Sequence, residues 1–333
     1  MLVPQEVDEL FGNLRGLKKE GISVIFISHK LDEVLSVADE ITVIRRGTTV
    51  KTVLPQEVTA RQLAELMVGS ELPSPSTETS TVTETVLLSV QHLSLPQPAG
   101  RPLLDDISFD IHKGEVLGIA GVEGNGQAEL VESIMAMRPG ATGTVELAGK
   151  DLSSRSTRER RDAGIGYIPE DRQRHGLLLD APLWENRILG HEGHPPTTRG
   201  PLIDRRGARK DTERIINEYD VRTPGPETLA RALSGGNQQK LIVGREMSGD
   251  PILLIASHPT RGVDVGAQAA IWEHIKTARR KGLAVLLISA DLDELIGLSD
   301  RIEVILRGRL VGTFDPDDVT PEQLGSAMTG AGA

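Results

Sequence analysis

Short apolar stretches, each about the length of one strand, recur along this chain between polar and amphipathic segments. The clearest span residues 252–256 and 284–288, and residues 114–120 also have the pattern of a strand, as is typical of strands buried on both faces. All are far shorter than the roughly 20 apolar residues that a membrane-spanning helix requires. Helical periodicity follows from Leu130 and again over residues 238–245. The pattern predicts buried strands that alternate with helices.

The composition favours an α/β fold. Aromatic residues make up 2% of the 333 residues, so the core must consist mainly of Leu, Ile, Val and Ala, as is usual in parallel sheets flanked by helices. The length allows two domains with buried cores. A formal net charge of −11 argues against nucleic acid or anionic lipid as the main partner of the surface. The absence of cysteine excludes disulfides and thiolate metal sites.

An internal repeat relates the two ends of the chain. Residues 23–69 match residues 284–330 at a constant offset of about 261 positions, which is the size of a domain. For example, the run VIFISHKLDE at residues 24–33 matches VLLISADLDE at residues 285–294. We expect each copy to form a strand, a helix, a second strand and a turn. The chain therefore contains one complete module and part of another.

A segment rich in Ser, Thr and Pro separates the two copies. Residues 71–84 offer too few apolar side chains for a core, which is typical of a linker. We therefore predict three parts: the C-terminal part of a first module over residues 1–70, a linker over residues 71–84, and a complete second module over residues 85–333.

The octapeptide LSGGNQQK at residues 233–240 is the strongest candidate for a binding site. Two adjacent glycines let the backbone approach an anion closely, and the octapeptide opens a helix whose N-terminal dipole favours a phosphate. The alternative is an ordinary Ser-Gly-Gly turn that opens a helix without a ligand. The octapeptide resembles the signature motif of ATP-binding cassette (ABC) ATPases, and the resemblance implies these nucleotide-binding residues: Leu233, Ser234, Gly235, Gly236, Asn237 and Gln238.

The resemblance also implies the fold of an ABC-type nucleotide-binding domain, a P-loop NTPase. Such a domain combines a RecA-like core, an antiparallel β subdomain and a helical subdomain. The composition of residues 175–233 suits the helical subdomain. The partial first copy of the repeat would be the C-terminal remnant of a second domain of this kind.

A glycine-rich loop follows the strand at residues 114–120, and a helix follows the loop. This order is typical of a phosphate cradle, although a lone glycine loop is also compatible with an ordinary turn. By resemblance, the loop ends in Lys and in Ser or Thr, which contact the outer phosphates and magnesium. Here Gln127 and Ala128 replace them. The implied cofactor-binding residues are Gly121, Gly124, Asn125, Gly126, Gln127 and Ala128.

Other motifs of the family are present with altered residues. Residues 166–172 resemble the loop whose glutamine senses the γ-phosphate, and Glu170 stands in place of that glutamine as a candidate ligand. Residues 257–264 resemble the end of the Walker B motif and the D-loop. Ser257 and His258 replace the aspartate that would hold magnesium and the glutamate that would polarise water. We regard His258 as a loop histidine rather than a base.

The intact motifs and the altered motifs belong to different ATP sites. In this family two modules pack head to tail, so that each ATP lies between the phosphate loop of one module and the signature of the other. The signature, the D-loop residue Asp264 and the switch histidine His29 all serve the first module's site, whereas Ala290 replaces the switch histidine of the second module. The resemblance therefore implies one hydrolytic site, with His29 as a catalytic residue, and one degenerate site without metal ligands.

Over its whole length the chain is similar to the tandem ATPases of simple-sugar and nucleoside importers. Residues 123–127 and 219–224 resemble the nucleoside branch. The resemblance implies ATP as the ligand, with Mg²⁺ mainly at the first module's site, and membrane permease subunits as partners. It also implies an indirect contribution from an extracytoplasmic solute-binding protein, a second ATPase half or copy, and a location at the cytoplasmic face of the cell membrane.

The beginning of the chain suggests a missing segment. The repeat offset sets Leu2 and Val3 opposite Val263 and Asp264, so that only the last ~70 residues of the first module are present. We hypothesise that Met1 marks a truncation or a misplaced start. An in-frame upstream stretch that encodes a phosphate loop would support this hypothesis, and a stop codon directly upstream would exclude the misplaced start.

Two other functions stay open on the sequence. A soluble tandem ABC protein would act on ribosomes or DNA, although the acidic surface and the short linker disfavour it. A binding-only pseudo-ATPase would dock on a permease without turnover, and for this chain alone we expect weak nucleotide binding and negligible ATPase activity. Coelution with ribosomes would favour the first, and normal turnover by the 333-residue chain would exclude the second.

Overall fold

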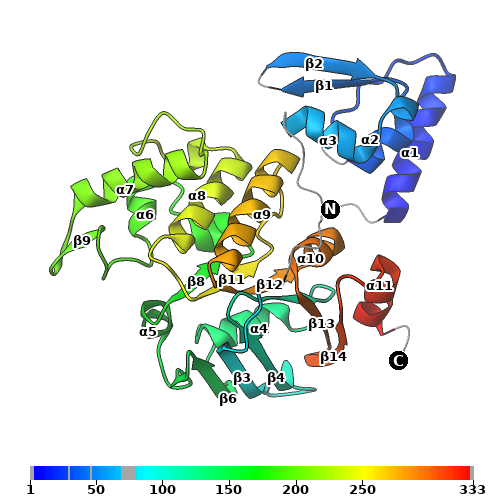
Figure 1. The fold of residues 1–333 in the computed structure, drawn as a ribbon. Helices are drawn as coiled ribbons and strands as arrows, with labels where there is room; N and C mark the ends of the chain where they lie inside the picture. The colour runs from blue at the N-terminus through cyan, green and yellow to red at the C-terminus, as the bar shows by residue number, and fades with distance from the viewer. Residues whose placement is uncertain (1–3, 29–30, 46, 69–79, 331–333) are drawn as a thin grey trace. The chain divides into compact units, whose positions relative to one another are not determined.

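A computed structural model describes residues 4–28, 31–45, 47–68 and 80–330. The chain divides into two compact units (Figure 1). The smaller unit is built mainly from the first 74 residues, and the larger unit contains residues 75–263 and 270–333. Within the four described ranges, no helix combines the length and the apolar character needed to cross a bilayer.

The smaller unit is built around a two-stranded hairpin. β1 (Ile41–Arg45) and β2 (Thr48–Val53) pair antiparallel. Ile41 and Val43 on β1 are buried together with Leu63 in a small hydrophobic core. The helical elements of this unit are α1 (Pro4–Lys19), α2 (Leu31–Val37), the 3-10 turn η1 (Pro55–Glu57) and α3 (Ala60–Val68).

Residues 22–28 do not form the strand that we expected for the first copy of the repeat. The side chains of Ile25 and Ile27 are each 91% exposed. In the described part of this unit the sheet consists of β1 and β2 alone, so residues 22–28 lack the neighbours that a buried parallel strand requires. The matching residues Leu286 and Ile288 are buried in the larger unit, where their strand has a neighbour on each side.

A six-stranded sheet forms the centre of the larger unit. Its strand order is β14, β13, β5, β12, β11 and β8, and all neighbours are parallel except β13 and β14. The apolar stretches predicted this parallel α/β core correctly. The strands are β5 (Val116–Ala120), β8 (Ile165–Ile168), β11 (Leu253–Ser257), β12 (Ala284–Ser289), β13 (Arg301–Leu306) and β14 (Arg309–Phe314).

Apolar side chains cover both faces of this sheet. Every residue of β5, β11 and β12 is buried, which explains why these strands lack an alternation of apolar and polar residues. Leu254 and Ala256 of β11 belong to one hydrophobic cluster, whereas Leu253 and Ile255 belong to another. Successive side chains of a strand point to opposite faces, so the sheet lies between two cores.

A four-stranded antiparallel sheet shares the second of these cores. Its strand order is β4, β3, β6 and β7, and it corresponds to the antiparallel β subdomain that the family resemblance implied. Buried and more exposed positions alternate along β4, as expected for a sheet with one covered face. The strands are β3 (Val86–Leu95), β4 (Leu104–His112), β6 (Thr142–Leu147) and β7 (Lys150–Asp151).

The remaining elements of the larger unit are mainly helices. Figure 1 shows α6, α7 and α8 grouped at the end of the larger unit that lies away from β3 and β4. Much of this group falls within residues 175–233, where we predicted a helical subdomain. The elements are α4 (Gln127–Ile134), α5 (Thr157–Asp162), the π-helical turn η2 (Arg172–Gly176), α6 (Leu183–Ile188), β9 (Thr198–Arg199), β10 (Leu202–Ile203), α7 (Arg205–Glu218), η3 (Ala230–Ala232), α8 (Gly235–Met247), α9 (Val265–Arg280), α10 (Leu292–Leu298) and α11 (Pro321–Thr329).

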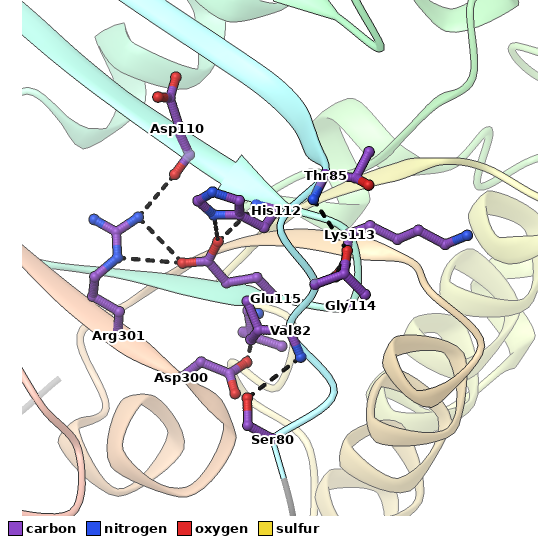
Figure 2. A network of polar contacts seen from close by, with 12 residues as sticks. Ser80, Val82, Thr85, Asp110, His112, Lys113, Gly114, Glu115, Asp300 and Arg301 are labelled. Atoms are coloured by element: carbon purple, nitrogen blue, oxygen red, sulfur yellow. Dashed lines mark hydrogen bonds and ion pairs between the residues drawn. The ribbon is translucent and has the colours of Figure 1, made fainter.

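A polar network holds the beginning of β5 (Figure 2). The buried carboxylate of Glu115 accepts hydrogen bonds from the backbone N–H of His112 (2.6 Å) and from Nε and Nη2 of Arg301 (3.2 Å each). The carboxylate of Asp300 accepts from the backbone N–H of Val116 (2.8 Å). Charged side chains from β13 and its preceding turn thus fix the strand that leads into the glycine-rich loop.

The turn that precedes β5 contacts part of the span that we predicted as a linker. The backbone N–H of Thr83 donates to the carbonyl oxygen of Lys113 (3.0 Å), and Oγ1 of Thr81 donates to that of Gly114 (2.9 Å). Gly114 has a φ of 75°, and a Cβ there would lie 2.4 Å from the carbonyl oxygen of Thr81. This close approach requires glycine. Residues 81–83 are therefore held within the larger unit by hydrogen bonds.

We expect residues 22–28 to exchange their amide hydrogens much faster than residues 284–289 in the 333-residue chain, because only the latter are paired within a sheet. Hydrogen–deuterium exchange followed by mass spectrometry measures both segments in one sample, and β1 serves as a reference for paired backbone in the smaller unit. Equal protection of the two segments would contradict this description of residues 22–28.

Candidate nucleotide-binding site

The candidate residues lie on loops that follow neighbouring strands of the central sheet. β5, β12, β11 and β8 are adjacent and parallel, so their carboxyl ends meet at one edge of the sheet, where open α/β sheets bind ligands. The loops after these strands carry Gly121, Ala290, His258 and Glu170 respectively. The topology therefore gathers these four candidate residues at one edge of the sheet.

The glycine-rich loop connects β5 to α4 in a conformation that exposes amide groups. Gly124 and Gly126 have φ values of 88° and 115°, which glycine adopts without strain. Gly126 is the N-cap of α4 and provides no side-chain cap, so the amides of the first turn are available to an anion. α4 begins at Gln127 rather than at Leu130 as we expected, because the left-handed Gly126 starts the helix directly after the loop.

Asn125 fastens this loop to the turn between β13 and β14. Its Oδ1 accepts a hydrogen bond from the backbone N–H of Arg307 (3.1 Å), and its carbonyl oxygen accepts from the N–H of Gly308 (2.8 Å). A Cβ on Gly308 would lie 2.4 Å from the carbonyl oxygen of Leu103, so glycine is needed at this contact. The side chain of Asn125 thus supports the loop, and its role as a ligand stays a prediction.

Gln127 lies folded against the loop. A Cβ on Gly121 would lie 2.5 Å from Nε2 of Gln127, so the two residues are in close contact. The side chain is buried, and its Oε1 has no hydrogen-bond partner among the described residues. An uncharged amide cannot supply the positive charge that lysine brings to phosphate, and the methyl group of Ala128 cannot bind a metal ion. The loop therefore fits phosphate through its backbone alone.

Glu170 is engaged in an ion pair across the same edge of the sheet. Its carboxylate pairs with the guanidinium of Arg261, which lies in the loop after β11. The two side chains are partly exposed, and the pair neutralises charge from both loops. Glu170 is thus held by protein groups in a position where the family has an uncharged glutamine.

His258 stands where the family has its catalytic glutamate. Its φ of 48° is unusual for a residue with a Cβ, and its backbone N–H donates to the carbonyl oxygen of Ile288 (2.7 Å). Burial lowers the pKa of His258, with a smaller opposing effect from Glu170 and Glu123. Burial therefore disfavours the protonated form of this imidazole.

The residues at this edge of the sheet do not fit Mg²⁺. Ser257 is buried at the end of β11 and brings a hydroxyl where the family has a carboxylate. Within the described ranges, no three His, Asp or Glu side chains come together as a metal site would require. Mg²⁺ prefers carboxylate, carbonyl and water oxygens in an octahedral arrangement. Among the described residues, this edge of the sheet therefore offers no built site for the metal.

The signature begins α8 as predicted. Ser234 is the N-cap, and its Oγ accepts hydrogen bonds from the backbone N–H (3.5 Å) and Nδ2 (2.9 Å) of Asn237. Leu233 and Gln238 are buried, and Nε2 of Gln238 donates to the carbonyl oxygen of Ala230 (3.1 Å). Ser234, Gly235 and Asn237 are the more accessible members, and Gly236 is buried.

Arg172 connects the signature to the loop after β11. Its guanidinium donates to the carbonyl oxygens of Arg261 (2.6 Å) and Gly262 (3.3 Å). A Cβ on Gly235 would lie 2.6 Å from Nη2 of Arg172, so the signature glycine leaves room for this side chain. We did not predict this role from the sequence, although Arg172 directly follows the pair Glu170-Asp171 of the altered motif.

Glu294 is a second residue that the sequence did not single out. It is buried and accepts hydrogen bonds from Oγ1 of Thr260 (2.7 Å), Oγ of Ser289 (2.7 Å) and Nε1 of Trp272 (3.0 Å). Burial raises its pKa, against these hydrogen bonds. In the smaller unit, Oγ of Ser28 donates to Glu33 (3.3 Å). The recurrence of Ser and Glu in the repeat was a signal for this contact.

Glu246 anchors α8 to the rest of the larger unit. It is buried and accepts hydrogen bonds from Nη2 of Arg161 (2.8 Å), Nε of Arg245 (2.8 Å) and the backbone N–H of Tyr167 (3.1 Å). Burial alone would raise the pKa of Glu246, but Arg245 and Arg161 outweigh it and lower the pKa to about 2. The helix that begins with the signature is thereby tied to β8 and α5.

Three other predicted positions are His29, Asp264 and Ala290, and the structure describes two of them. His29 lies outside the described residues. The carboxylate of Asp264 accepts from the backbone N–H of Ala267 (2.9 Å) at the beginning of α9. Ala290 is exposed. No hydrogen bond or ion pair in the described ranges joins the signature directly to the glycine-rich loop of the same unit.

Comparisons with known proteins agree with this geometry. Residues 104–261 match the family model described as ABC transporter. The nucleoside import ATP-binding protein NupA of Lactococcus lactis is 40% identical over 330 residues, which cover 99% of this chain and 65% of that protein. The glucose import ATP-binding protein TsgD13 of Haloferax volcanii is 41% identical over 334 residues, which cover 100% of this chain and 61% of that protein. The chain thus spans less than two thirds of the length of these relatives.

A solved structure shows the same fold. The chain is similar to the ADP conformation of MJ1267, an ATP-binding cassette of an ABC transporter, with a TM-score of 0.60 and 21% sequence identity over 74% of this chain and 95% of that one. This similarity shows that the chain shares the α/β fold of that ATP-binding cassette. The two named relatives are described as ATP-binding proteins for the import of a nucleoside and of glucose.

We expect Glu294→Ala to lower the free energy of unfolding by about 3 kcal/mol, because three buried donors lose their acceptor. Urea denaturation followed by circular dichroism measures the change. Glu273→Ala is the control, since it removes a half-exposed carboxylate paired with Arg280 and should cost less than about 1 kcal/mol. Similar losses in both variants would contradict a structural role for Glu294.

We expect Glu246 to make the fold sensitive to acid. A carboxylate whose folded pKa is about 2, against 4.5 ordinarily, stabilises the fold fully above pH 4.5 and loses this contribution as the pH falls toward 2. Between pH 4.5 and pH 3 the wild type should lose about 2 kcal/mol more stability than Glu246→Gln. Urea denaturation across this range tests the difference, and equal pH dependence of the two proteins would contradict it.

Proposed function

We propose that this chain is part of the ATP-binding, energy-coupling subunit of an ABC importer for nucleosides or simple sugars, and that its larger unit carries a degenerate ATP site. One observation carries the proposal: the phosphate cradle is intact, while the groups that would act on phosphate or metal are replaced together. The replacements are Gln127, Ala128, Glu170, Ser257, His258 and Ala290.

In this proposal, the residues of the larger unit bind a nucleotide without hydrolysing it. The amides of residues 124–128 at the beginning of α4 would hold the phosphates of ATP, which supplies free energy through its binding and hydrolysis. Each lost charge-assisted contact is worth about 1.5–3 kcal/mol, so the affinity is at least about tenfold weaker per contact than in an intact site. Glu170 is paired with Arg261, so its carboxylate is engaged by a protein cation, and we regard His258 as a loop histidine rather than a base.

The signature serves a different ATP site in this proposal. Ser234, Gly235 and Asn237 are accessible at the beginning of α8, and Arg172 and Glu246 hold this helix in place. We infer that the second module lends its signature and the D-loop residue Asp264 to the ATP site of the first module. The catalytic switch residue of that site would be His29, and Mg²⁺ would act mainly there.

The partners follow from the same family resemblance. We propose that membrane permease subunits receive the movement of the ATPase, that an extracytoplasmic solute-binding protein contributes indirectly, and that the chain works at the cytoplasmic face of the membrane. A second ATPase half or copy would supply the phosphate loop of the hydrolytic site. The nucleoside and glucose import relatives support this assignment.

A binding-only role is the second candidate for the 333-residue chain by itself. It is favoured by the lack of metal ligands at the carboxyl edge of the sheet, since the described residues contain no built metal site. Such a pseudo-ATPase would still contact a permease and respond to nucleotide without turnover.

The test is purification of the native complex by a tag on the chromosomal copy, after mild detergent extraction of the cells. We expect permease subunits to copurify and the complex to hydrolyse ATP. Ser234→Arg should abolish that hydrolysis, because a bulky cation at the signature blocks the γ-phosphate. Gln127→Met, a matched change in the degenerate loop, should alter the rate less than about twofold. Equal loss in both variants would overturn the asymmetry, and copurification of ribosomes without a permease would overturn the transport role.

A further inference from the structure

A short hairpin in the helical region combines exposed apolar side chains with a cluster of cations. β9 and β10 pair antiparallel, with Arg199 opposite Leu202, and Figure 1 shows β9 at the edge of the larger unit. Leu202 is 71% exposed and Ile203 is 45% exposed. Leu202 is the most exposed large hydrophobic residue among those described in the larger unit.

The charge of this segment is opposite to that of the whole protein. Residues 198–210 contain five cationic residues and one carboxylate, Asp204, whereas the chain has a formal net charge of −11. The cationic residues are Arg199, Arg205, Arg206, Arg209 and Lys210.

Little of this positive charge is neutralised within the fold. The carboxylate of Asp204 caps α7 by accepting from the backbone N–H groups of Arg206 (3.0 Å) and Gly207 (2.9 Å). Arg209 pairs with Glu227. Among the ion pairs of the described residues, none involves Arg199, Arg205, Arg206 or Lys210, and the last three lie in the first two turns of α7, where the helix dipole disfavours cations.

We propose that residues 198–206 dock directly on an anionic phospholipid surface, with Leu202 and Ile203 in the interface and Arg199, Arg205 and Arg206 on lipid phosphates. Arginine binds phosphate oxygens through two parallel hydrogen bonds. The boundary between lipid headgroups and acyl chains accommodates apolar side chains next to cations. Burial of the apolar side chains and attraction of the cations to anionic lipid both contribute to binding there. This contact is additional to any held through permease subunits and does not depend on the ATP chemistry.

The surface fits a bilayer better than a protein or a nucleic acid. The two strands have two residues each, whereas each side of a stable protein interface comprises roughly 20–30 residues. Residues 198–210 contain no aromatic side chain on which bases would stack. The acidic remainder of the chain limits the contact to this small surface and makes it reversible and sensitive to salt.

The experiment is sedimentation of the 333-residue chain with vesicles of phosphatidylcholine alone or with about one third phosphatidylglycerol. We expect binding to the anionic vesicles only, lost at about 0.5 M salt. The triple variant R199E, R205E and R206E should reduce the bound fraction at least about fivefold, and L202S with I203S about threefold. The control variant R101E, K150E and K281E makes the same change in net charge at exposed positions elsewhere. It should bind anionic vesicles better than the R199E, R205E and R206E variant does.

A labelling experiment keeps the test independent of the folding of these variants. The chain has no cysteine, so Leu202→Cys and Arg101→Cys can each carry one environment-sensitive fluorophore. We expect a blue shift with anionic vesicles for the label at position 202 and none at position 101. No binding of the wild type above phosphatidylcholine, equal loss in the two charge-reversal variants, or binding to polyglutamate without binding to vesicles would each overturn the proposal.

Discussion

Burial of the parallel sheet on both faces is the constraint on which the rest of the larger unit depends. β5, β11 and β12 have no exposed residue, so their polar backbone groups must be paired within the sheet and their connections can leave only at its edges. The glycine-rich loop and the loop with His258 therefore emerge together at the carboxyl edge. Strand order therefore sets the position of the candidate site, and single side chains do not.

Buried carboxylates connect the loop after β11 and the signature helix to the sheet. Glu294 joins the loop after β11 to the end of β12, and Glu246 joins the signature helix to β8. Such groups are stable inside a protein only when their partners are complete. The polar contacts of both groups are complete among the described residues, so these two carboxylates hold the loop after β11 and the signature helix in place.

The two copies of the repeat show how far a strand depends on its surroundings. Residues 24–28 and 285–289 have nearly the same apolar pattern, yet only the second copy lies in a sheet. A buried parallel strand is stable because neighbours on both sides satisfy its backbone and because layers on both faces cover its side chains. The surface shows a similar dependence on position, since a chain of net charge −11 gathers exposed apolar residues and cations on the hairpin of β9 and β10 and on the first two turns of α7.

The sequence by itself determined the features that depend on neighbouring residues: the buried strands, the glycine-rich loop after β5, the signature at the beginning of α8, and the repeat. Local periodicity and backbone requirements are enough for these. Only the tertiary structure decided that Gln127 folds against Gly121, that Glu170 pairs with Arg261, and that Arg172 reaches the signature. Two of these contacts join residues that are distant in the sequence, and the third depends on how the loop folds. Their partners are set by strand order and packing rather than by local pattern.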